Sequence, residues 1–359
     1  MSKSINNSRN NDNTELRTAE SVSPGHPDKI CDQISDAILD AHLRQDPLAR
    51  VAVDVAGGHG KILVTGEVSS RTKKVDVTKI VKRLAGDIEL IENIATQSLE
   101  IAQGVDTGGA GDQGIMIGYA CDETPELLPA EVVLSRRLNQ FLYKKWPYDG
   151  KTQVTLSVIA RGATTKQPSV IRSVVASWQN VAKDELKQAV NDWILEQVQN
   201  DIATAGNDLE LHINPAGDWN QGSFDSDAGL TGRKLAVDNY GPRIPIGGGA
   251  FSGKDATKVD RSAAYIARRI AVDYLKKRKA HEVFVRLAYA IGYDQPLEKT
   301  VIIDGKAEEI ATWTSDQARN DVRYDLTPNG IIEFLNLRRP IYEATARYGH
   351  FGEGFNWDA

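Results

Sequence analysis

Strand-like segments of this 359-residue chain occur in adjacent pairs, with helical segments between the pairs. Residues 50–56 and 61–69 form one pair around a glycine-rich turn at 57–60, and residues 152–159 and 170–178 form another. A doubly wound parallel sheet would instead require regular alternation of strand and helix. The pattern therefore predicts an α+β fold.

The helical segments are predicted by apolar residues that recur at steps of three and four. The clearest example follows the loop at 23–29, where Ile30, Ile34 and Ile38 share one face and Pro27 suits the first turn. A second follows the glycine-rich loop that ends near residue 260. The other predicted helices cover 77–102 (with a possible break near Asn93), 130–145, 183–199 and about 329–337, and single strands are predicted at 115–119 and 282–290.

The composition excludes several classes of protein. A net charge of −6 disfavours a general binder of nucleic acid or of a membrane surface, which would need a basic face. Cys31 and Cys121 are too few for a disulfide framework or a cysteine-based zinc site. No apolar run reaches 18 residues and no signal-peptide pattern opens the chain, so we expect a cytoplasmic protein with a disordered tail at 1–14.

Residues 247–255, Gly-Gly-Gly-Ala-Phe-Ser-Gly-Lys-Asp, are the strongest functional signal. Read from Gly248, they match the phosphate-binding pattern G-x-x-x-x-G-K, but Asp255 stands where a Ser or Thr should reach Mg²⁺. Glycines let backbone N–H groups approach a phosphate, and Lys254 adds a positive charge. From these residues alone, a phosphate loop and a flexible surface loop are equally good interpretations.

Three further loops concentrate charged residues. The loop at 23–29 holds His26, Asp28 and Lys29, although a His-Pro-Asp sequence is more often a simple helix cap. The loop at 227–234 ends in an Arg-Lys pair, which is usually just a solvated face. The third, at 104–114, is rich in glycine. Four such loops, with 247–260 included, are less readily explained as helix caps and solvated surface in a chain with a net negative charge.

Six runs of the sequence, in the same order, resemble the signature motifs of the methionine adenosyltransferase (S-adenosylmethionine synthetase) family. The similarity extends from about Thr18 onward, and the motifs are long and specific. The runs are 20–29, 109–114, 227–234, 247–255, 258–264 and 348–352.

The resemblance implies three α+β subdomains with pseudo-threefold symmetry, each a mixed sheet with helices on its outer face. We place them at about 15–111, 112–229 and 230–359. It also implies a homodimer, often paired into tetramers, with active sites at the subunit interface. The implied reaction joins ATP and L-methionine into S-adenosylmethionine and then hydrolyses the triphosphate to pyrophosphate and phosphate.

The resemblance also implies roles for individual residues. Four match the catalytic cations and the group near the breaking C5′–O bond: His26, Lys151, Arg233 and Lys254. The ATP site would add Asp149, Gly150, Trp219, Asp227, Lys234, Ala250 and Ile291. The methionine site would comprise Glu67, Gln103, Asp112, Asp227 and Lys258.

Metal binding would depend on three carboxylates. Asp28 and Asp260 match ligands of the two Mg²⁺ ions of each site, because a hard cation prefers oxygen ligands. Asp54 stands where the family usually has a Glu that helps to bind K⁺, so potassium binding is expected to be weakened. Trp219 likewise replaces a usual Phe, and its ring still offers a face for adenine.

Two other interpretations of the sequence fit its residues less well. A P-loop NTPase would need a strand directly before Gly248, where Pro242 and Pro245 stand instead. A regulatory homologue that binds without turnover would not need both Asp28 and Lys254. A thioether sulfur attacks without a general base, and the sequence accordingly shows no nucleophilic triad.

Overall fold

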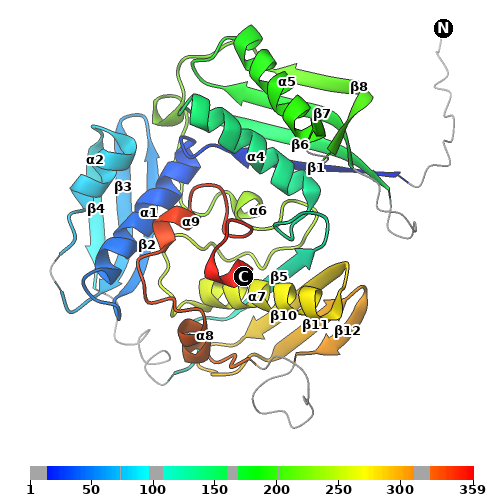
Figure 1. The fold of residues 1–359 in the computed structure, drawn as a ribbon. Coiled ribbons are helices and arrows are strands. Elements are labelled where there is room, and N and C mark those ends of the chain that lie inside the picture. The colour runs from blue at the N-terminus through cyan, green and yellow to red at the C-terminus, as the bar shows by residue number, and fades with distance from the viewer. Residues whose placement is uncertain (1–13, 73, 97–107, 160–168, 200–202, 311–323) are drawn as a thin grey trace, which may run out of the picture.

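The computed structural model describes residues 14–359 except 73, 97–107, 160–168, 200–202 and 311–323. These residues form three four-stranded sheets, each with its own helices, around a centre that also contains the C-terminal segment (Figure 1). The α+β class expected from the sequence is confirmed.

The first sheet has the order β4-β3-β2-β9. β2 and β3 are the antiparallel pair expected from the sequence, and β4 runs parallel to β3. The elements are α1 (Pro27–Leu43), β2 (Arg50–Gly58), β3 (Lys61–Ser69), α2 (Val77–Ala85), β4 (Glu89–Ala95) and β9 (Gly229–Leu230).

The second sheet has the order β1-β6-β7-β8, with β8 parallel to β7 and the other pairs antiparallel. The expected one-sided burial of the 152–159 segment holds through Leu156, because Val154 and Leu156 are fully buried while Gln153 and Thr155 are half-buried; it is wrong at Ser157, which is buried. The elements are β1 (Thr14–Val22), α4 (Ala130–Lys145), β6 (Gly150–Ile159), β7 (Ser169–Trp178), α5 (Lys183–Gln199) and β8 (Ala203–Ile213).

The third sheet has the order β12-β11-β10-β5 and is antiparallel throughout. Its strands and helices are β5 (Gly114–Cys121), α7 (Val259–Arg278), β10 (Glu282–Tyr289), β11 (Glu298–Ile303), β12 (Lys306–Glu309) and α8 (Pro328–Phe334). The short remaining elements are η1 (Ser223–Asp225), α6 (Leu235–Asp238), α9 (Tyr342–Thr345) and η2 (Asn356–Asp358).

Each sheet takes one strand from a neighbouring third of the chain. β1 precedes α1 but pairs with β6, β5 precedes α4 but pairs with β10, and β9 precedes α7 but pairs with β2. Each third therefore contributes its first strand to the sheet of another third, and the three contributions form a closed cycle. This exchange underlies the pseudo-threefold arrangement (Figure 1), and no third completes its own sheet.

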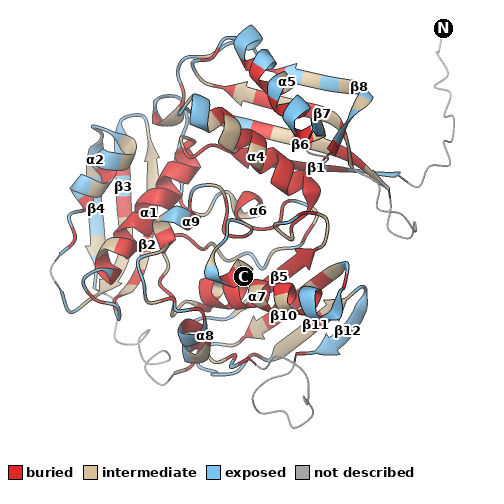
Figure 2. Cartoon of the chain, in the orientation of Figure 1, coloured by how far each residue is buried: buried red, intermediate tan, exposed pale blue. Residues whose placement is uncertain are grey.

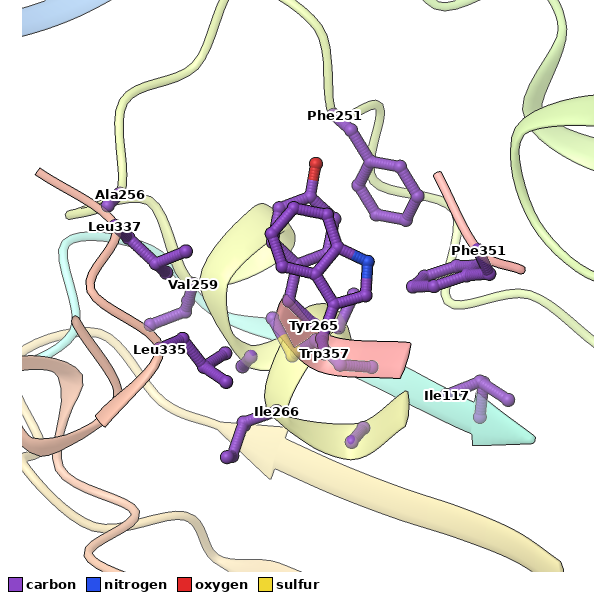
Figure 3. Close-up of a cluster of buried hydrophobic side chains, with 14 of the residues drawn as sticks. Ile117, Phe251, Ala256, Val259, Tyr265, Ile266, Leu335, Leu337, Phe351 and Trp357 are labelled. Carbon is purple, nitrogen blue, oxygen red and sulfur yellow. The ribbon is translucent and has the colours of Figure 1, made fainter. Parts of the chain in front are cut away.

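The first long helix of each third lies deep in the molecule, on the side of its sheet that faces the centre and not on the outer face that the resemblance implied (Figure 1). α1, α4 and α7 are mostly buried (Figure 2), and in α1 every residue except Ala41 is buried. In the centre, the rings of Tyr265 and Trp357 stack with centroids 3.8 Å apart, beside Phe251 and Phe351 (Figure 3). A helix buried on all sides must find partners for its polar residues inside the protein.

The predicted helix over 77–102 is wrong from Gly86 to Ala95. α2 ends at Ala85 and is followed by Gly86, whose φ of +79° suits a glycine, and residues 89–95 form β4 instead. Short apolar runs fit both helical and strand spacing, so the parallel pairing with β3 decided the outcome. Residues 97–107 lie outside the described residues. The sequence also gave no sign of β1, which begins at Thr14, the last residue of the expected tail.

Candidate active site

The loop before α1 is fastened to the start of β6. Ser23 donates its backbone N–H to the carbonyl of Gly150 at 2.8 Å, and the N–H of Gly150 donates to Ser23 Oγ at 3.1 Å. His26 caps α1, because its Nδ1 accepts the backbone N–H of Asp28 at 3.1 Å. The capping interpretation of His-Pro-Asp is therefore correct, and the cap also fixes the imidazole beside Lys151 on β6.

The buried imidazole of His26 is held neutral. Burial, followed by the positive charges of Lys234 and Lys151, lowers its pKa to about 4. Because Nδ1 accepts a hydrogen bond, the proton of the neutral ring lies on Nε2. His26 can therefore donate a hydrogen bond from Nε2 without carrying charge.

We expect the imidazole of His26 to stay neutral from pH 8 to below pH 5. Its folded-state pKa lies below the ordinary value of 6.5, so its contribution to stability is complete above pH 6.5 and declines as the pH falls toward 4. Histidine NMR titration, with His26→Asn to assign the signal, measures this pKa. Asn keeps a side-chain cap. A His26 signal that titrates near pH 6.5 would contradict the assignment.

Asp28 binds the 227–234 loop to the start of α1. Its carboxylate accepts the N–H of Leu230 at 2.9 Å and pairs with the ammonium of Lys234, and an Arg233 nitrogen lies 3.9 Å away. Burial alone would raise the pKa of Asp28, but these hydrogen bonds from Lys234 and Leu230 lower it. Both predicted phosphate-binding cations of this loop thus lie beside His26 and Asp28.

Several of the predicted nucleoside residues lie close to these two loops. The carboxylate of Asp149 accepts the N–H of Ser223 at 2.9 Å, and burial raises its pKa. Asp227 is exposed, and its negative charge acts to raise the pKa of both His26 and Asp149. Three further predicted residues lie in close contact with neighbouring segments: Gly150, at the start of β6, against Trp178, the half-buried Trp219 against Gly222, and Ala250 against Gly232.

The Gly-rich loop is attached to β2. Val53 donates its N–H to the carbonyl of Gly253 at 3.0 Å, and Asp255 accepts the N–H of Val51 at 2.7 Å. Lys254 forms a bridge opposite Ala52. Asp255 therefore has a structural partner where a P-loop would have a metal-binding hydroxyl, and within the described stretch 241–250 no strand precedes Gly248, which rules against the P-loop interpretation.

Lys254 and Asp260 form an ion pair of 2.6 Å at the start of α7. Asp260 lies under two glycines, since a side chain on Gly249 or Gly114 would collide with it. Lys258, which is predicted for the methionine site, forms an ion pair with Asp255. Each of the two carboxylates predicted to bind Mg²⁺ is thus paired with a lysine predicted to bind phosphate, and no group of three potential metal-binding side chains occurs among the described residues.

Asp54 and Glu67 lie on the outer face of the first sheet. The strand register places them on the same side as Lys254, because Glu67 and Lys254 both pair with Ala52. Asp112 and Ile291 are exposed in other loops, and no hydrogen bond or ion pair among the described residues joins them to these cations. Gln103 lies outside the described residues.

Three buried residues behind the site were not predicted: Asp32, Asp36 and Arg261. Asp32 accepts the N–H of Gly232, while Asp36 accepts the N–H of Gly253 and binds Arg261. The available sequence signal was the four-residue spacing of aspartates in the helix that follows Pro27, which puts charged groups on a face that also carries apolar residues.

Comparisons with known proteins agree with this geometry. Three family models match: the N-terminal domain of S-adenosylmethionine synthetase over residues 14–107, its central domain over 107–219 and its C-terminal domain over 221–359. S-adenosylmethionine synthase of Pelagibacter ubique is 39% identical, with 96% of each chain covered. The enzymes so named from Cereibacter sphaeroides and Treponema denticola are 42% and 41% identical, with 95% of each chain covered. With matched domains across nearly its whole length, the chain belongs to the S-adenosylmethionine synthetase family.

Proposed function

We propose that this chain joins ATP and L-methionine into S-adenosylmethionine and then cleaves the triphosphate to pyrophosphate and phosphate. One observation carries the proposal. The neutral, buried His26 and the cations Arg233 and Lys234 lie together at the N-terminus of α1, and Lys254 is held beside β2 of the first sheet. Membership of the family and the names of the relatives support it.

These residues suit a displacement at the ribose C5′. The attacking thioether sulfur carries no proton, so the protein must align the reacting atoms and stabilise charge on the leaving triphosphate. Arg233, Lys234, Lys254 and Lys151 would bind that growing charge. His26 would donate its Nε2 proton in a hydrogen bond near the breaking C5′–O bond.

The carboxylates fit a pair of Mg²⁺ ions bound together with polyphosphate. Mg²⁺ usually takes only one or two protein carboxylates and completes its shell with phosphates and water, which matches the separate positions of Asp28 and Asp260. When bound, the metal would neutralise phosphate charge. Lys234 and Lys254, now paired with those carboxylates, would then be released to the phosphates.

The remaining residues would bind the two substrates. Asp149, Gly150, Trp219, Ala250 and Ile291 would surround the nucleoside. Glu67, Gln103, Asp112 and Lys258 would surround methionine, with Asp227 serving both.

The direct test is mass-spectrometric detection of S-adenosylmethionine from the purified chain with ATP, methionine and Mg²⁺. We expect product only when both substrates are present, and phosphate release that depends on methionine. Release of phosphate from ATP without any S-adenosylmethionine would instead favour an ATPase. Binding of both substrates without any turnover would favour a regulatory homologue.

We further propose that the active form is a dimer, or a tetramer of such dimers. An exposed row of apolar residues, Leu230, Ala56, Leu63 and Ile91, crosses the outer face of the first sheet. Asp54 and Glu67 are on the same face, so a second copy seated there would complete the site.

Leu63→Glu should convert the dimer to monomer and abolish most activity, because a charge in an apolar interface is costly. Light scattering during size-exclusion chromatography measures the mass, and product formation measures activity. Leu195→Glu, at an exposed leucine on α5, is the matched control and should change neither. A fully active monomer would contradict the dimer.

We expect weaker activation by potassium than the family's usual Glu provides. Asp54 is shorter by one methylene, about 1.5 Å, whereas a metal site tolerates only about 0.2 Å in ligand distance. β2 cannot move toward the ion, because β3 and the Lys254 segment flank it. Initial rates in K⁺, Na⁺ and a bulky organic cation test this, and Asp54→Glu should increase the K⁺ effect. Strong, saturable K⁺ activation of the unaltered enzyme would refute it.

No helix among the described residues is both long and apolar enough to cross a bilayer. Both cysteines are buried, and neither forms a disulfide. Together with the acidic net charge, these observations support a cytoplasmic location without nucleic-acid partners as part of this proposal.

A further inference from the structure

Every fourth residue of α1 from its second position is an aspartate. Asp28, Asp32, Asp36 and Asp40 lie on one face, since a helix turns once in 3.6 residues, and all four are buried. Like charges at this spacing destabilise an isolated helix. We call these four residues the aspartate ladder, and its cost requires partners from elsewhere in the fold.

Each member of the aspartate ladder accepts backbone N–H groups from a segment far away in the sequence. The first two hold the loop with Arg233 and Lys234, the third holds the loop with Lys254, and the fourth holds the start of α9. The donors are Leu230 for Asp28 (2.9 Å), Gly232 for Asp32 (2.9 Å), Gly253 for Asp36 (2.8 Å), and Tyr342 and Glu343 for Asp40 (both 3.0 Å).

One rigid helix therefore sets the spacing between the two cation loops. Successive members of the ladder are about 6 Å apart along the axis, at about 1.5 Å of rise per residue. A cation on a long, flexible side chain stabilises a transition state best when its backbone is fixed in advance.

Asp36, the third member of the aspartate ladder, binds a buried arginine side chain in addition to a backbone N–H group. Asp36 binds both terminal nitrogens of the fully buried Arg261, at 2.7 and 2.8 Å. Arg261 also donates to the carbonyl of Lys254 at 3.0 Å and to Thr345 Oγ1 at 3.1 Å. The N–H of Gly253 and the carbonyl of Lys254 are thus held by the same ion pair.

We propose that Asp36 and Arg261 are positioning residues for Lys254 in the reaction proposed above, on which this inference rests. Neither side chain would touch substrate. Stability alone is a poor explanation of the pair, because a buried ion pair can often be replaced by apolar residues without loss. The pair also holds the N–H of Gly253 and the carbonyl of Lys254, and both of these groups belong to the backbone of the loop that carries Lys254.

The test compares variants in two backgrounds. Arg261→Lys keeps the charge but loses the planar, multiply bonded fork, and Asp36→Leu/Arg261→Met removes the pair without leaving a lone buried charge. We expect each to lower kcat by at least about tenfold with little change in KM for methionine. In a Lys254→Ala background, the same changes should cost less than about twofold, because they act through Lys254.

Asp40→Asn is the matched control, since Asp40 is on the same helix and accepts N–H groups, but from α9 instead of a cation loop. It should leave kcat within about twofold of the unaltered enzyme while lowering the melting temperature. Equal losses of kcat in the wild-type and Lys254→Ala backgrounds would overturn the proposal, as would unchanged kcat in Arg261→Lys.

A readout without catalysis separates this inference from the proposed function. Amide hydrogen exchange at Gly253 should quicken in Arg261→Lys, while exchange at Gly232, held by Asp32, stays unchanged. If the unaltered chain made no S-adenosylmethionine, the proposed function would fail but this result would still support the positioning of the loop. Unchanged exchange at Gly253 would refute the positioning.

Discussion

Lys254→Ala should lower kcat by about 100- to 1,000-fold, which is the usual effect of removing one preorganised partner of transition-state charge. Among the described residues the ammonium of Lys254 forms one ion pair, with Asp260, while the backbone of its loop is held by β2, Asp36 and Arg261. The side chain can therefore be removed without releasing the loop, and the fold should persist.

Steady-state formation of S-adenosylmethionine measures this effect, and circular dichroism checks the fold. Lys82→Ala is the matched control, because Lys82, on α2 of the same third, is exposed and forms a surface ion pair with Asp87. It should leave turnover unchanged. Wild-type turnover in Lys254→Ala would end the proposed phosphate role of this loop.

Asp28→Asn should raise the concentration of Mg²⁺ needed for half-maximal rate at least tenfold, because the hard cation loses an anionic ligand. The same change also frees Lys234 and weakens the hold on Leu230. A fall in maximal rate alone would therefore not identify a metal ligand.

Lys234→Met separates the two effects. It removes the ammonium but leaves the carboxylate of Asp28, so it should lower the maximal rate with little change in the Mg²⁺ requirement. If Asp28→Asn and Lys234→Met gave the same Mg²⁺ titration as the unaltered enzyme, Asp28 would be only a structural carboxylate at the helix start.

Local patterns made much of this molecule predictable. The helices over 130–145 and 183–199 agree with the structure residue for residue, because long, strongly periodic segments carry their own signal. Where two periods fitted equally well, as at 89–95, the prediction failed. The four charged or glycine-rich loops were visible for a similar reason, since glycine and clustered charge are local properties of the sequence.

Pairings between distant segments could not be predicted. Nothing local to β1 indicates that it pairs with β6 instead of the strands of its own third, since that choice depends on which strand edge the rest of the chain leaves open. Likewise, the four-residue spacing of the aspartate ladder is visible in the sequence, but its backbone partners lie 200 to 303 residues away along the chain.

The sequence by itself determined which chemical groups the loops carry, and the resemblance of those loops to the family's motifs is what predicted His26, Asp28, Arg233, Lys234 and Lys254 as a phosphate- and metal-binding set. Only the tertiary structure decided their states and spacing. Burial beside two lysines is what keeps His26 neutral, and a single buried helix is what sets the two cation loops at a fixed separation. Charge state and distance depend on neighbours that only the folded chain brings together.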